Sequence, residues 1–174
     1  MKIIMKTVKY VFIFIVAIVS IYTILVISNI RNVKKFIKNN TGIAVSKCKK
    51  VVENDNHGGF HGDGETMKEY DCSKVDIKVD EGKLKKFPLS ENLNLIMYGG
   101  EKDGVKYMYN LASESGIPYI EEGYYYFFDD YGKMYKDTDD YNSDKKLFDR
   151  YSFNFTLIMF DSNTKHLYYY EFDT

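Results

Sequence analysis

The stretch "RYSFNFTLIMFDSNTKHLYYYEFDT", residues 150–174, decides the fold. Two runs of aromatic and aliphatic residues flank the polar sequence "DSNTK", which is the pattern of a β-hairpin. A turn within that pentapeptide pairs Leu157 with Tyr170 and Phe155 with Phe172. Because alternate strand residues share a face, these pairs lie on one side of the hairpin. The sequence therefore predicts an antiparallel sheet built around its C-terminus.

Further short elements precede this hairpin. The sequence predicts strands over 43–53, 66–73, 74–80, 104–112 and 123–130, all bounded by Gly-, Asp- or Pro-containing turns. "SENLNLIMYGG" reads as a short helix that starts at Ser90 and stops at Gly99. We therefore predict an α+β fold, a mainly antiparallel sheet of about five or six strands with one or two short helices, preceded by one transmembrane helix.

The transmembrane prediction comes from "YVFIFIVAIVSIYTILVIS", residues 10–28, which contains no charge, Gly or Pro. A helix of this length reaches roughly 28 Å, about the thickness of a bilayer's hydrocarbon core. The run is longer than the apolar part of a cleaved signal peptide, which favours an uncleaved signal anchor. Cleavage after Ser28 is the alternative.

The predicted layout has four parts: a basic tail over 1–9, a transmembrane helix over 10–30, a basic juxtamembrane helix or linker over 31–41, and a globular domain over 42–174. Basic residues are nearly equal in number on the two sides of the apolar run, so the positive-inside rule does not decide its orientation. A short tail before a folded domain favours export of that domain. We expect a single-pass protein of the cell membrane, in contact with the lipid bilayer, with its C-terminal domain outside the cytoplasm.

Charge is divided unevenly along the chain. Residues 1–50 hold ten Lys and Arg and no acid, whereas residues 51–174 hold 14 basic residues against 25 acids, a net charge of −11 (14 − 25). Nucleic-acid binding by the domain is therefore disfavoured, because phosphate binding needs the opposite sign.

The most unusual loop is "DNHGGFHGDGE", residues 55–65. Asp55, His57, His61 and Asp63 offer nitrogen and oxygen ligands of the kind that zinc accepts. The four glycines argue against a helix that would bring both imidazoles to one face. A glycine-shaped hairpin loop is the favoured interpretation, and a metal site or a contact to a ligand or partner through His57, His61 and Asp63 are the alternatives. No cofactor is expected.

Cys48 and Cys72 are the only cysteines. A hairpin centred on Phe60 places them opposite each other, at the spacing that a disulfide needs after modest adjustment. A bridge is expected if the domain is exported to an oxidising compartment, and two free thiols are the alternative.

Tyrosine is abundant, with 17 residues, and Trp is absent. Tyr124, Tyr126, Tyr168 and Tyr170 lie in predicted strands, where alternate rings face outward. Strand propensity explains them most simply. A recognition surface for a protein or a glycan is the alternative, and these four tyrosines are its candidate binding residues.

Catalytic motifs are missing from the sequence. "GGEKDGVK", residues 99–106, lacks the Gly-Lys-Ser/Thr ending of a phosphate-binding loop, and no nucleophile elbow or zinc-protease helix occurs. The acidic run over 137–144 reads as a solvated loop, with calcium binding as the alternative. We therefore name no catalytic residue and favour binding over catalysis.

Three stretches, "NDNHGGFHGDGET", "PLSENLNLIMYGGEKDGV" and residues 150–174, resemble those of an uncharacterised family of small bacterial proteins with an N-terminal membrane anchor and one C-terminal domain. The resemblance implies that layout and no activity. The expected function is partner binding by an exported, non-enzymatic domain in an immunity-like or envelope-sensing role. A metal-binding domain or metal-dependent enzyme using loop 55–65, and cell-wall glycan binding through the Tyr-rich strands, are the alternatives.

Overall fold

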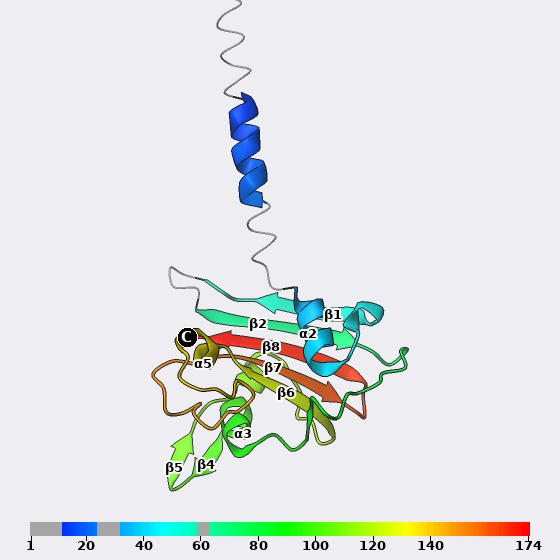
Figure 1. Cartoon of the computed structure of the whole chain (residues 1–174). Coiled ribbons are helices and arrows are strands. Elements are labelled where there is room, and N and C mark those ends of the chain that lie inside the picture. The colour runs from blue at the N-terminus through cyan, green and yellow to red at the C-terminus, as the bar shows by residue number, and fades with distance from the viewer. Residues whose placement is uncertain (1–11, 24–31, 59–62) are drawn as a thin grey trace, which may run out of the picture. The chain divides into compact units, whose positions relative to one another are not determined.

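The computed structural model describes residues 12–23, 32–58 and 63–174 (Figure 1). The chain divides into two compact units, residues 1–36 and 37–174. In the first unit, residues 12–23 form a helix whose side chains are exposed. Helix α2 (Val33–Thr41) begins in the first unit and ends in the second.

The predicted transmembrane helix over 10–30 is wrong. Among residues 12–23, 32–58 and 63–174, no helix is long and apolar enough to cross a membrane. Residues 10, 11 and 24–30 of the predicted span lie outside the described residues.

The second unit is an α+β domain, as the sequence predicts. Its main sheet has the strand order β1-β2-β8-β7-β6-β3, and every neighbouring pair is antiparallel (Figure 1). The strands of this sheet are β1 (Lys49–Asp55), β2 (Gly64–Asp71), β3 (Lys85–Lys86), β6 (Gly123–Asp129), β7 (Asn154–Asp161) and β8 (His166–Asp173). The other elements are the 3₁₀ turn η1 (Val45–Lys47), helices α3 (Glu91–Tyr98), α4 (Leu111–Glu114) and α5 (Asp130–Tyr135), and a separate hairpin of β4 (Gly100–Lys102) and β5 (Val105–Tyr107).

The C-terminal hairpin has the register that the sequence predicts, with Leu157 opposite Tyr170 and Phe155 opposite Phe172. Strand β7 lies inside the sheet between β6 and β8, and its residues from Phe155 to Asp161 are all buried. Burial on both faces explains why this strand reads as an almost continuous apolar run. It is the centre of the domain.

The main hydrophobic core lies on one face of the sheet. Alternate residues of β7 and β8, among them Leu157 and Tyr170, pack there with side chains of α3 and α4. Helix α3 contributes Leu93, Ile96 and Met97, none of which is exposed. The helix stops at Gly99, whose φ of 74° suits glycine.

The segment before β1 differs from its predicted strand. Residues 45–47 form a 3₁₀ turn, and the strand starts only at Lys49. Ile43 and Val45 are buried all the same. Their i, i+2 spacing fits a strand, but the turn also buries both side chains. Residues 74–80 likewise form no regular strand, although their apolar residues alternate.

Candidate functional site

The Gly/His loop connects β1 to β2. Residues 59–62, which include His61, lie outside the described residues. His57 Nδ1 lies 2.8 Å from Asp55 Oδ1 and 3.2 Å from Thr66 Oγ1. Hydrogen bonds from the His57 side chain, and then from its backbone N–H, hold the pKa of Asp55 below its usual value. His57 therefore has a local partner that stabilises the strand end.

One glycine of this loop is required by close packing. A Cβ atom on Gly64 would lie 2.7 Å from the carbonyl oxygen of Asn56. Asp63, which precedes it, is exposed. Within the described ranges, no three His, Cys, Asp or Glu residues are grouped so that they could hold a metal ion. The proposed metal ligands Asp55, His57 and Asp63 are thus not assembled into such a group there.

Cys48 and Cys72 form a disulfide, with a Cα–Cα distance of 4.6 Å. The adjoining pair in the ladder is Lys49 opposite Asp71, so the cysteines continue the same register. The bridge covalently joins the residue that follows η1 to the residue that follows β2.

The structure divides the four candidate tyrosines between two faces of the sheet. Tyr168 and Tyr170 are buried in the main core. The Tyr170 hydroxyl donates to Glu65 Oε2 at 2.8 Å, and burial raises its pKa well above the usual value. These two rings therefore cannot form a recognition surface.

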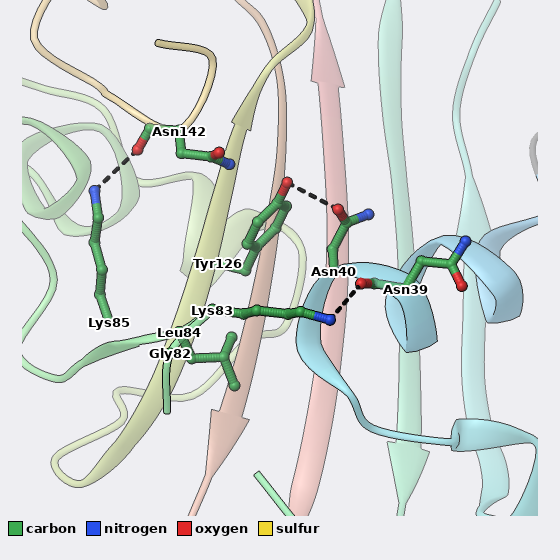
Figure 2. Close-up of a pocket in the computed structure, with 8 residues that line it drawn as sticks. All are labelled: Asn39, Asn40, Gly82, Lys83, Leu84, Lys85, Tyr126 and Asn142. Carbon is green, nitrogen blue, oxygen red and sulfur yellow. Dashed lines mark hydrogen bonds between the residues drawn. The ribbon is translucent and has the colours of Figure 1, made fainter. Parts of the chain in front are cut away.

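Tyr124 and Tyr126 lie on the other face. Their hydroxyls donate to Glu81 Oε1 at 2.8 Å and to Asn40 Oδ1 at 3.0 Å, respectively. Tyr126 also lines a pocket of about 470 Å³, which Figure 2 shows. The pocket is lined by Asn39, Asn40, Gly82, Lys83, Leu84, Lys85, Tyr126 and Asn142.

An aromatic cluster joins β5 to the chain before β7. The ring centroids of Tyr107 and Phe148 are 4.9 Å apart, those of Tyr109 and Phe153 are 5.6 Å apart, and those of Phe148 and Phe153 are 6.0 Å apart. We call these four rings, together with Val105, Met108 and Tyr151, which adjoin them along the chain and are exposed, the aromatic patch. Tilted and edge-to-face contacts of this kind stabilise the cluster.

The outer part of the aromatic patch is open to solvent. Val105, Met108 and Tyr151 have exposed fractions of 55%, 86% and 109%, respectively. The surface beside residues 106–109 is hollowed by about 390 Å³. Figure 1 shows the β4–β5 hairpin extending beyond the main sheet, next to α3. Large exposed apolar side chains on an ordered base are typical of an interaction surface.

The acidic run over 137–144 is only partly a solvated loop, because several of its residues hold the structure together. Asp137 accepts two hydrogen bonds from Arg150, at 2.9 and 3.0 Å. Asp144 is buried and accepts from the Ser90 hydroxyl at 2.5 Å. Asn142 donates to the Phe127 carbonyl oxygen at 2.8 Å. These contacts fix the segment that leads into Phe148.

Comparisons with protein families, with characterised proteins and with solved structures find no match to this chain. The resemblance to a family of membrane-anchored bacterial proteins stays a prediction.

Sequence reasoning missed both the pocket and the aromatic patch. The pocket gathers residues 39–40, 82–85, 126 and 142, which are far apart in the chain. For the patch, the sequence shows Tyr107 and Tyr109 alternating, but the predicted strand over 104–112 is wrong in its length: β5 ends at Tyr107, and α4 begins at Leu111.

Proposed function

We propose that residues 37–174 form a non-enzymatic domain that binds a protein partner through the aromatic patch. The observation that carries this proposal is the exposure of Val105, Met108 and Tyr151 beside ordered rings. Burying such side chains against a partner releases about 25 cal/mol per Å² of apolar surface. Aromatic residues and Met are also enriched in the centres of protein interfaces.

The partner should present an apolar face and carry a net positive charge. Residues 51–174 carry a net charge of −11, from 14 basic and 25 acidic residues. Complementary charge accelerates encounter and selects against acidic competitors. The net negative charge of the domain also disfavours nucleic acid as the partner.

We propose an extracytoplasmic location for this domain. The disulfide between Cys48 and Cys72 supports it, because such bridges form and persist in oxidising compartments. A binding domain in that location suits an immunity-like or an envelope-sensing role, and the identity of the partner separates these two roles.

The test compares two variants of the full chain in the cells that produce it. Met108→Glu places a charge in the aromatic patch, and Val51→Glu places the same charge on β1, where Val51 is 47% exposed. After cross-linking and purification, a true partner is recovered with the native chain and with Val51→Glu, and at least tenfold less with Met108→Glu. Equal recovery with both variants would reject the aromatic patch as the binding surface.

A further inference from the structure

The pocket of Figure 2 lies between the end of α2 and the β3–β6 edge of the sheet, and it shares no lining residue with the aromatic patch. Its volume of about 470 Å³ falls within the range of small-molecule sites. Five of its eight lining residues are polar, two lysines and three asparagines. A small polar molecule fits this composition better than an apolar one.

Two ammonium groups are held in this pocket by carbonyl oxygens. Lys83 Nζ donates to the backbone oxygen of Asn39 at 3.2 Å, and Lys85 Nζ donates to that of Asn142 at 2.9 Å. Figure 2 shows the two side chains extending in different directions from β3 and the residues before it, with Tyr126 between them in that view. An ammonium has three N–H donors, so each keeps donors for a bound group.

The two cations differ in how far their charge is already neutralised. Lys83 Nζ lies 3.5 Å from Asp80 Oδ2. Lys85 has no carboxylate within ion-pair distance in the part of the chain that the structure describes. Its neighbour Lys86 pairs with Glu81 at 3.5 Å and does not line the pocket. Lys85 is therefore the cation best able to bind an anion here.

We infer that this pocket binds the oxyanion group of a small polar molecule of about sugar size, with Lys85 as its principal contact. A carboxylate and a phosphate share the required chemistry, since both offer several acceptor oxygens to N–H donors. The net negative charge of the domain repels anions at long range, so local contacts must supply the binding.

The experiment titrates the full chain, at low salt, with glucuronate, glucose 6-phosphate and uncharged glucose. We expect at least one of the two anionic sugars to bind at least tenfold more tightly than glucose. The comparison between the two anions distinguishes a carboxylate ligand from a phosphate ligand. Failure of both anionic sugars to bind more tightly than glucose would overturn the inference.

Matched lysine variants then locate the site. Lys85→Gln removes the cation that lines the pocket and should weaken binding of the anionic sugar at least tenfold. Lys86→Gln removes the adjacent, 68% exposed cation outside the pocket and should leave binding within twofold of the native value. Both variants should keep the native unfolding midpoint, because both side chains are on the surface. Equal loss in the two variants would mean non-specific attraction to surface charge and would contradict this site.

Discussion

Arg150 and Asp129 form a buried ion pair with two parallel hydrogen bonds, Nη1 to Oδ1 at 2.6 Å and Nη2 to Oδ2 at 2.7 Å. Only 6% of the arginine side chain and 2% of the aspartate side chain are exposed. Asp137 completes the arrangement, and the Tyr131 ring lies 4.7 Å from the guanidinium. The pair ties the end of β6 to the segment that carries Phe148, Tyr151 and Phe153, which belong to the aromatic patch.

Removing Arg150 should destabilise the domain strongly. Burial lowers the pKa of the guanidinium, but the ion pairs with Asp129 and Asp137 outweigh this and hold the pKa above its usual value. Arg150→Leu leaves a buried carboxylate unpaired and should lower the free energy of unfolding by about 3–5 kcal/mol. Urea unfolding measures the loss. The exposed Lys145→Leu is the control, and a similar loss in that variant would contradict the role of the pair.

The disulfide should contribute measurably to stability. Cys48 and Cys72 are 24 positions apart, and closing a loop of that length stabilises a protein by about 3 kcal/mol in the chain-entropy account. Reductant should lower the native unfolding midpoint. The double variant Cys48→Ala, Cys72→Ala should start from that lower midpoint and no longer respond to reductant. A native midpoint that reductant does not change would contradict the bridge.

Alkaline pH should destabilise the domain through Tyr168. Burial and the charges of Glu69 and Asp161 raise the pKa of Tyr168 from 10.0 to about 12. The unfolded chain therefore loses this proton first as the pH rises. The free energy of unfolding should therefore be unaffected by Tyr168 below pH 10. It should fall by about 2–3 kcal/mol, the equivalent of a two-unit difference in pKa, as the pH rises from 10 toward 12.

Unfolding curves recorded between pH 8 and 11.5 measure this effect. Tyr168→Phe should flatten the decline in stability above pH 10, and Tyr109→Phe, which alters a tyrosine on the surface, should leave it unchanged. Identical curves for Tyr168→Phe and the native chain would show that Tyr168 does not carry the pH dependence.

Close packing at Gly123 should make this position intolerant of a side chain. A Cβ atom there would lie 2.0 Å from the Phe160 carbonyl oxygen in the neighbouring strand. Gly123→Ala should therefore cost at least about 1 kcal/mol in the free energy of unfolding. Gly58→Ala is the matched control, because its nearest contact would be an ordinary 3.7 Å. Equal stability of the two variants would contradict the strand pairing at Gly123.

The sequence predicts those parts of the fold that depend on local pattern. The alternation in residues 150–174 is enough to pair Leu157 with Tyr170, because a one-residue slip would turn every large side chain to the wrong face. The stop at Gly99 also follows from local chemistry, since glycine tolerates a positive φ.

Features that depend on which segments meet in the folded domain cannot be predicted from local sequence pattern. Tyr168 and Tyr124 look alike in the sequence, yet one is buried in the main core and the other hydrogen-bonds to Glu81 on the opposite face. Lys85 and Lys86 are neighbours, yet Lys85 donates to Asn142 across the pocket and Lys86 pairs with Glu81. Such differences arise from which segments meet in space.

Photo-cross-linking from Met108 in living cells tests the proposed function most directly. A photo-reactive residue replaces Met108 in the aromatic patch or, as the control, Val51 on β1, and the adducts are compared after irradiation. We predict one discrete adduct with a second protein from position 108 and none from position 51. No adduct from position 108, or the same adducts from both positions, would contradict the proposal that the aromatic patch binds a partner.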